Sequence, residues 1–245
     1  MNNRFCIIIP IYNHHHKLNE LLHDLSCYEL PVFLIDDGSE ENSRVKINTI
    51  SKQYPLVELH TLPENQGKGG AVMAGLRLAF QGGFSHGIQI DADYQHDLKD
   101  IPEFMGLSSQ SPKALICGVP QYDHTVNKGR YYARYLTHVW VWINTLSFDI
   151  KDSMCGFRSY PLDLTVALIN RVKLGQRMNF DTEILVRLHW QQVQIINLPT
   201  KVVYHHDVPS NFKAFKDNVG ISWMHTKLFF GMLLRLPVLL FRKIK

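Results

Sequence analysis

Two carboxylates and one amide follow an apolar run near the middle of the chain. Asp91, Asp93 and Gln95 alternate along this segment. In extended backbone, residues two apart face the same way, so these three side chains can converge on one point. Carboxylate and amide oxygens are ligands that Mg²⁺ and Mn²⁺ prefer, and such an ion usually takes further ligands from a substrate's phosphates. The spacing predicts a divalent-metal site, although an isolated acidic pair of this kind is more often a solvated turn.

The elements that must position this segment alternate along the first half of the chain. Continuous apolar, β-branched runs predict strands that are buried on both faces. These strands are expected at residues 5–11, 32–35, 57–62, 87–90 and 114–117. Helices are expected between them, at residues 17–25, 40–52, 70–80 and 98–107. The alternation predicts an α/β fold whose mainly parallel sheet is flanked by helices, with ligands bound at the carboxyl ends of the strands.

Polar side chains follow three of the predicted strands. Asn13 follows the first strand, Asp36 and Asp37 follow the second, and Asp91 follows the fourth. Past Gly118 the alternation loosens. The expected elements there are a polar loop at 121–128, helices at 129–146 and 181–191, and strands at 154–160, 193–198 and 202–204.

Composition narrows the class of protein. With 245 residues, of which 45% are hydrophobic, the chain can form a sizeable core, which excludes a disordered protein. A formal charge of +4 is too mild to favour nucleic acid. The four cysteines show no zinc-ligand spacing, and no signal peptide is evident at the start, so we expect a cytoplasmic protein.

The C-terminal stretch differs in character from the rest. Two apolar runs, 228–234 and 236–241, are each too short to span a bilayer, and Pro237 is expected to kink or end the helix. The basic residues that interrupt or flank them are Lys227, Arg235, Arg242, Lys243 and Lys245. This pattern is typical of an amphipathic helix at a membrane surface, although a helix packed on the domain or on a partner subunit has a similar composition. We expect one domain at 1–215 and a basic amphipathic helical segment at 216–245.

Taken in order, the motifs resemble those of the family 2 glycosyltransferases, most closely the polyprenyl- or dolichyl-phosphate mannosyl- and glucosyltransferases. The matching motifs are Ile9-Pro10-Ile11-Tyr12-Asn13, Ile35-Asp36-Asp37-Gly38-Ser39, Asn65-Gln66-Gly67-Lys68-Gly69-Gly70-Ala71, Asp91-Ala92-Asp93-Tyr94-Gln95-His96, Cys155-Gly156-Phe157-Arg158-Ser159-Tyr160 and Asn179-Phe180-Asp181-Thr182-Glu183. The resemblance implies a glycosyltransferase-A fold and an inverting transfer of one sugar from a UDP- or GDP-linked nucleotide-sugar. It also implies Mg²⁺ or Mn²⁺, a lipid-phosphate or glycolipid acceptor, and a peripheral location on the cytoplasmic face of the inner membrane.

The resemblance also assigns roles to residues. The donor site is expected to comprise Pro10, Tyr12, Asp36, Asp37, Lys68, Asp91 and Lys213, with Asp91, Asp93 and Gln95 as metal ligands. Tyr12 would lie against the nucleobase, while Asp36 or Asp37 would accept hydrogen bonds from base or ribose. Gly67 and its neighbours open a helix, so their backbone N–H groups can face phosphate or ribose.

The acceptor determines whether a base is needed. A phosphate is already ionised, whereas a hydroxyl needs a base, for which Asp181 or Asp152 are the candidates. Arg130 and Arg134, four residues apart on one helix face, and Arg158 are candidates for binding phosphates. The expected catalytic residues are Asp93, Asp181, Arg130 and Arg134. Surface salt bridges are the alternative interpretation of these charges.

The chain departs from the family pattern at several positions. His14 begins a three-histidine run where relatives commonly have glutamate, and we interpret this run as a solvated turn. No arginine follows Gly118, which weakens the case for an acceptor-phosphate contact there. His205 and His206 could close over the donor or stabilise a loop. A non-catalytic nucleotide-sugar-binding membrane adaptor is the remaining alternative, but intact metal ligands argue against it.

Overall fold

The computed structural model describes residues 3–121, 128–202 and 214–242; the side chains of 128–133, 214 and 216 are not described. A seven-stranded sheet forms its centre, in the order β3-β2-β1-β4-β6-β5-β7. The strands are β1 (Phe5–Ile11), β2 (Val32–Asp36), β3 (Val57–Thr61), β4 (His86–Gln89), β5 (Leu115–Gln121), β6 (Arg158–Pro161) and β7 (Ile195–Lys201). The α/β fold and the positions of the first five strands along the chain are as the sequence predicts.

One strand runs against the others. β1 to β4 pair in parallel and β7 pairs in parallel with β5, whereas β6 is antiparallel to both β4 and β5. The prediction of a mainly parallel sheet is therefore confirmed. The expected strand at 154–160 is wrong at its start, because Asp152 accepts the backbone N–H groups of Met154 and Cys155, each at 2.8 Å. Those groups turn the chain instead of joining a strand ladder.

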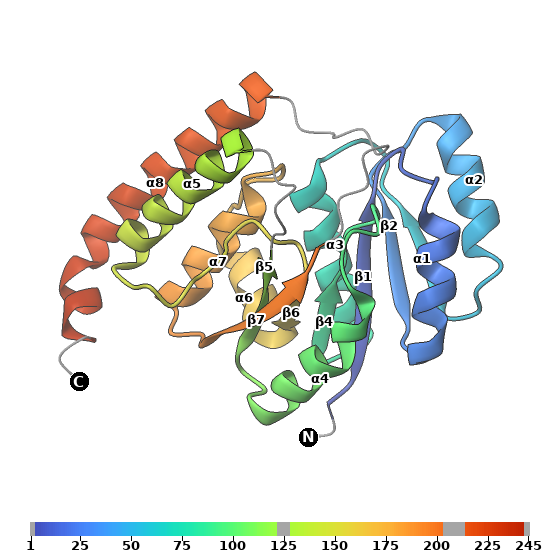
Figure 1. Cartoon of the computed structure of the whole chain (residues 1–245), viewed down its shortest axis with the longest axis horizontal. Coiled ribbons are helices and arrows are strands. Elements are labelled where there is room, and N and C mark those ends of the chain that lie inside the picture. Colours follow the sequence, from blue (N-terminus) through green and yellow to red (C-terminus); the bar gives the residue numbers. More distant parts are fainter. Residues whose placement is uncertain (1–2, 122–127, 203–213, 243–245) are drawn as a thin grey trace.

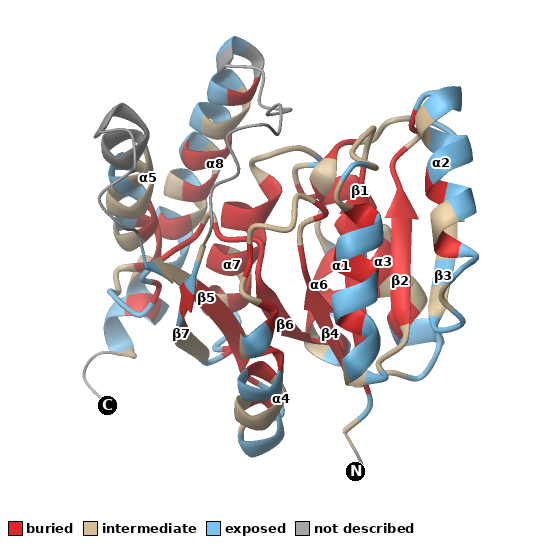
Figure 2. Cartoon of the chain, turned by 45° about the vertical axis from the view of Figure 1, so that its right-hand side comes forward, coloured by how far each residue is buried: buried red, intermediate tan, exposed pale blue. Residues whose placement is uncertain are grey.

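Helices cover both faces of the sheet (Figure 1). They are α1 (Leu18–Leu25), α2 (Glu41–Ser51), α3 (Lys68–Gln81), α4 (Ile101–Gln110), α5 (Lys128–Thr145), α6 (Leu162–Arg171), α7 (Phe180–Trp190) and α8 (Ala214–Phe241). Alternate residues of β1 face opposite ways. Ile7 and Ile9 pack in one buried cluster with α1 and α4, and Cys6 and Ile8 pack in another with α3, α6 and α7. The strands β1, β2, β4 and β6 are accordingly buried on both sides, whereas the edge strand β3 is only partly buried. The helices α1, α2 and α4 show exposed outer faces (Figure 2).

The helix α6 is absent from the sequence prediction. It begins at Leu162, directly after β6 ends at Pro161, so no turn or polar loop marks its start. Its inward face is apolar at helical spacing, and Leu162, Val166 and Ile169 are buried.

The C-terminal helix α8 joins both apolar runs into one element. It continues through Pro237, so the expectation that the helix ends there is wrong. Leu239 beyond the proline is 4% exposed, and its packing holds the last turn in place. By length and composition the segment Asp217–Phe241 could cross a membrane: its most apolar window has a mean hydropathy of 1.4, and 28% of that window is buried in the domain. The helix packs on α5 and α7.

Candidate active site

The loops after β1 and β2 are joined at the carboxyl edge of the sheet. Asn13 has a φ of 58°, a left-handed conformation that asparagine tolerates. Its backbone N–H donates to Ser39 Oγ at 2.9 Å, and its Oδ1 accepts the N–H of Glu40 at 2.9 Å. These bonds fix the loop beside Pro10, which is buried in β1, and Tyr12, which is half-buried just beyond it.

The two aspartates after β2 have different partners. Asp36 Oδ1 accepts the N–H of Ser39 at 3.0 Å, while its buried Oδ2 has no hydrogen-bond partner in the described part of the chain. Asp37 accepts the N–H groups of Gln66 and Gly67, each at 2.8 Å. Burial raises the pKa of Asp37, although these two hydrogen bonds lower it. Asp37 thus holds the glycine-rich loop in place through two hydrogen bonds, and Asp36 has one acceptor oxygen, Oδ2, that makes no hydrogen bond in the described part of the chain.

The glycine-rich loop packs against the start of α7. Gly67 has a φ of 93° and precedes α3, and Gly70 donates its N–H to Gln176 O at 2.9 Å. A Cβ on Gly69 would lie 2.3 Å from that of Phe180, so only glycine allows this approach. The prediction that the N–H groups of Gly67 and Gly70 face a ligand is therefore wrong, because protein oxygens accept them.

Lys68 lies between two carboxylates that come from distant parts of the chain. Its ammonium is 2.8 Å and 2.9 Å from the two oxygens of Asp91 and 3.1 Å from Asp181 Oδ2. Burial lowers the pKa of Lys68, but the charges of Asp181 and Asp91 outweigh it and raise that pKa well above its ordinary value. We call Asp91, Lys68 and Asp181 the charge cluster; it joins the end of β4 to the first turns of α3 and α7.

The acidic segment after β4 is a turn. β4 ends at Gln89, Tyr94 has a φ of 57°, and the N–H of Gln95 donates to Asp93 Oδ1 at 3.2 Å. The expected extended backbone is therefore wrong here, since this local hydrogen bond replaces a strand ladder. Even so, the carboxylates interact: burial raises the pKa of Asp93, and the charge of Asp91 raises it further.

The segment around Gly156 packs against the same carboxylate. A Cβ on Gly156 would lie 2.5 Å and 2.6 Å from the oxygens of Asp91. His96 Nε2 is 3.7 Å from Asp91, and its buried ring packs on Phe157. Burial raises the pKa of Asp91, but Lys68 and His96 outweigh it and lower that pKa below its ordinary range. Sequence reasoning gave His96 and Gly156 no role, although both stand inside matched motifs.

The donor set fits a hard divalent cation. No three His, Cys, Asp or Glu side chains of the described residues are gathered into a metal-binding group. Asp91, Asp93 and Gln95 supply two carboxylates and one amide, so substrate phosphates would complete the ligand shell. The repulsion that raises the pKa of Asp93 is what a divalent cation would relieve. The two carboxylates therefore fit Mg²⁺ or Mn²⁺ in type of ligand, and Gln95 as a third ligand stays a prediction.

Arg134 on α5 forms a two-bond ion pair. Its Nε and Nη2 donate to the carboxylate of Asp152 at 2.7 Å each, and His138 Nε2 lies 3.4 Å from the same group. Burial raises the pKa of Asp152, but His138 and Arg134 hold it well below its usual range. Asp152 also accepts two backbone N–H groups. Because its carboxylate oxygens already have these partners, it is poorly suited to act as a base.

The other predicted cationic residues fall into two groups. Arg158 is fully buried and donates to the backbone oxygens of Asp181, at 2.6 Å, and Ser153, at 2.8 Å. Its predicted phosphate contact is therefore wrong, since Arg158 fixes the backbone that carries Asp181. The side chain of Arg130 lies outside the described residues, as do Lys213, His205 and His206.

The chain has a glycosyltransferase-A fold, as its similarity to solved structures shows. The glucosyl-3-phosphoglycerate synthase of Mycobacterium tuberculosis, solved in complex with Mn²⁺ and UDP-glucose, is similar with a TM-score of 0.67 and 13% identity. The similarity covers 96% of this chain and 79% of that one. The family model described as glycosyl transferase family 2 matches residues 6–172, and the chain belongs to that family. It is a glycosyltransferase.

Two relatives are similar over most of this chain. The dolichyl-phosphate β-glucosyltransferase of Dictyostelium discoideum is 26% identical over 73% of this chain and 60% of its own length. The UDP-N-acetylglucosamine–dolichyl-phosphate N-acetylglucosaminyltransferase of Methanococcus voltae is 22% identical over 81% of this chain and 85% of its own. The chain thus spans about three fifths of the Dictyostelium relative.

Proposed function

We propose that the protein transfers one sugar, with inversion, from a UDP- or GDP-linked nucleotide-sugar to a polyprenyl-phosphate-type lipid, with Mg²⁺ or Mn²⁺. The observation that carries this proposal is the charge cluster, which lies beside Asp93 at the carboxyl edge of the sheet. Open α/β sheets bind ligands at this edge. Two relatives named for dolichyl-phosphate substrates support the acceptor class.

The donor would lie along the loops after β1, β2 and β4. Tyr12 would contact the base beside Pro10, and Asp36 would offer its unpartnered oxygen. When bound by Asp91, Asp93 and Gln95, the metal would supply charge neutralisation for the departing nucleoside diphosphate. The roles of Lys213 and Arg130 in binding donor and acceptor phosphates remain predictions.

The pairing of Asp181 favours a phosphate acceptor. One oxygen of its carboxylate, Oδ2, is 3.1 Å from the Lys68 ammonium, so the group already has an ion-pair partner. A phosphate acceptor is already ionised and needs positive charge more than a base. Turnover that survives Asp181→Asn would support this class, whereas a hydroxyl acceptor on a glycan or glycolipid would require the carboxylate.

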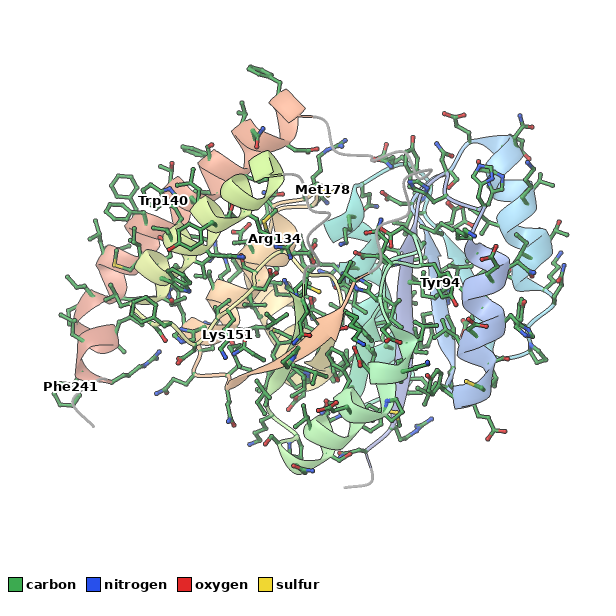
Figure 3. All side chains as sticks on the ribbon, in the orientation of Figure 1. Tyr94, Arg134, Trp140, Lys151, Met178 and Phe241 are labelled. Carbon is green, nitrogen blue, oxygen red and sulfur yellow. The ribbon has the colours of Figure 1, made fainter. Side chains whose placement is uncertain are left out.

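The lipid acceptor and its membrane would contact the outer side of α5 and α8. We define the apolar face as the exposed residues Leu136, Trp140 and Ile143 of α5 with Trp223, Phe230, Leu234 and Val238 of α8. The Trp140 ring lies 6.2 Å from Phe229, edge to face, and so bridges the two helices. In Figure 3 Trp140 lies on the outer side of these helices, and Arg134 lies nearer the sheet. Such a face suits peripheral attachment to the cytoplasmic side of a membrane.

The first test removes one predicted metal ligand. In Asp93→Ala, Mn²⁺-dependent donor binding should fall by at least 100-fold, on the order of 3 kcal/mol, because one of two carboxylate ligands is lost. Calorimetry with the nucleotide-sugar that gives the largest Mn²⁺-dependent thermal shift measures this change. The control Asp163→Ala removes an exposed carboxylate on α6 and should leave binding unchanged. Equal affinity in Asp93→Ala and wild type would refute the metal assignment.

Catalysis needs its own measurement. Metal-dependent release of free sugar from the donor by the wild type, absent in Asp93→Ala, would separate an enzyme from a non-catalytic nucleotide-sugar-binding adaptor.

A further inference from the structure

The Lys68 ammonium contacts the carboxylate of Asp91, which is also a predicted metal ligand. It lies within 2.9 Å of both oxygens of Asp91, and Gly156 covers that carboxylate from another side. A cation that binds Asp91 must therefore displace this ammonium or share the carboxylate with it. The competition is direct, because both cations seek the same oxygens.

We propose that Lys68 is an exchangeable cation of this site. It neutralises Asp91 in the metal-free protein, and it moves to the donor's diphosphate when metal and donor bind together. This inference rests on the proposed metal and donor site.

The geometry allows this exchange without leaving the Lys68 ammonium unpaired. Asp181 lies 3.1 Å from the ammonium and remains its partner after Asp91 is taken by the metal. Asp181 is itself held in place, because Arg158 donates to its backbone oxygen at 2.6 Å. Lysine carries a compact charge on a flexible stem, and the Lys68 side chain is 19% exposed, so the protein does not enclose it completely.

A coupling between metal and donor follows from this arrangement. Without donor, the metal must break the contact between Lys68 and Asp91, which weakens metal binding. With donor, the displaced ammonium gains the diphosphate as a partner, which strengthens the binding of both. Lys68 would thereby keep the site from holding a metal ion when no nucleotide is present.

The test compares Mn²⁺ binding in the full chain with and without nucleotide. In Lys68→Met, the affinity for Mn²⁺ alone should rise about 10-fold, because the competing charge is gone. The affinity for UDP or GDP at saturating Mn²⁺, whichever the wild type binds, should fall about 10-fold, because a phosphate contact is lost. Lys68→Arg, which keeps the charge, should retain weak binding of Mn²⁺ alone, and Lys52→Met, which removes an exposed lysine after α2, should change neither affinity.

Folding of each variant is checked by its thermal midpoint, and Lys68→Gln replaces Lys68→Met if the latter does not fold. Unchanged or weaker binding of Mn²⁺ alone in the folded, uncharged variant would overturn the inference while the proposed function stands. A wild type that binds neither UDP nor GDP with Mn²⁺ would refute the metal site, and this inference with it.

Discussion

At the scale of single residues, the position of Asp91 depends on what surrounds its carboxylate. Lys68 contacts both oxygens, His96 lies 3.7 Å away, and the backbone of Gly156 leaves no room for a side chain. The first two interactions are electrostatic, whereas the third is steric. The carboxylate is therefore fixed from several directions before any ligand arrives, as preorganised binding requires.

Adding one methyl group beside Asp91 tests this steric contact. In Gly156→Ala the new Cβ would stand 2.5 Å from a carboxylate oxygen, so Asp91 or the loop must shift. We expect Mn²⁺-dependent donor affinity to fall about 10-fold or more, measured by calorimetry, with a loss of about 1–3 kcal/mol of stability. Gly106→Ala is the control, because a Cβ there meets nothing within 4 Å. Donor affinity unchanged in Gly156→Ala would show that this contact does not position Asp91.

The sequence predicts which charges stand at strand ends but not how they pair. Asp91 and Asp36 follow apolar runs, so their places at the sheet edge can be predicted from the pattern. The partners of Lys68 depend on α7 reaching the start of α3, a contact that no local pattern encodes. The predicted phosphate contact of Arg158 is wrong for a related reason. Its motif suggests such a contact, whereas the antiparallel strand β6 places its guanidinium in the core.

At the scale of elements, the packing of α8 on α5 buries an ionisable group. His225 is 6% exposed, and its Nδ1 lies 3.3 Å from Asn144 Nδ2 on α5. Burial lowers the pKa of His225 from its ordinary 6.5 to about 4. The folded protein thus binds this proton only below about pH 4, whereas the unfolded chain binds it below about pH 6.5. Since the unfolded state holds more protons in between, stability must fall as pH drops through this window.

Replacing this histidine should flatten that pH dependence. His225 contributes a loss of up to about 3 kcal/mol between pH 6.5 and 4, and the loss is complete at the lower pH. Urea unfolding of His225→Gln at several pH values should show a smaller decline than the wild type. The matched variant His23→Gln removes an exposed histidine on α1 and should keep the wild-type slope. Identical slopes for all three proteins would mean that His225 titrates normally in the fold.

Elements marked by hydrophobic period and clear turns can be predicted from this sequence, and elements defined by tertiary contacts cannot. β1 and β2 are nearly continuous apolar runs and β3 alternates apolar with polar residues, so their places follow from the sequence pattern. The direction of β6 depends on pairing with β4, which lies far away in the chain. The helix α8 continues past Pro237 because Leu239 packs against the domain, a contact that outweighs the missing N–H.

At the scale of the whole molecule, α8 combines basic residues that contact α7 with an exposed apolar face. Two basic side chains contact the end of α7: Arg235 of α8 lies over the Trp190 ring at 4.6 Å, and Arg242, just after α8, donates to Trp190 O at 2.9 Å, whereas Lys243 and Lys245 lie outside the described residues. Lys227 lies 3.9 Å from Glu183. The exposed side of the helix carries the apolar face, where Leu234 is 84% exposed, and Lys227 stands on that side, four residues from Trp223 and seven from Leu234. Attachment to a membrane would therefore depend on apolar insertion more than on attraction between these basic residues and anionic lipid, contrary to what the composition of the helix suggests.

The exposed apolar face predicts how the protein binds lipid. The triple variant Trp223→Ser, Phe230→Ser, Leu234→Ser removes exposed apolar groups while leaving the buried contacts of α8 intact. Each of these side chains contributes on the order of 1.5 kcal/mol when buried in lipid, so sedimentation with phosphatidylcholine vesicles should weaken by more than 100-fold. The control triple variant Val45→Ser, Leu56→Ser, Phe80→Ser alters exposed apolar residues on and near α2 and α3, which are 44–53% exposed, and should bind as the wild type does. Added salt should change wild-type binding little, because Arg235 and Arg242 are held by Trp190. Binding that requires anionic lipid and disappears in salt would instead assign attachment to the basic residues, and equal binding by both triple variants would exclude the apolar face.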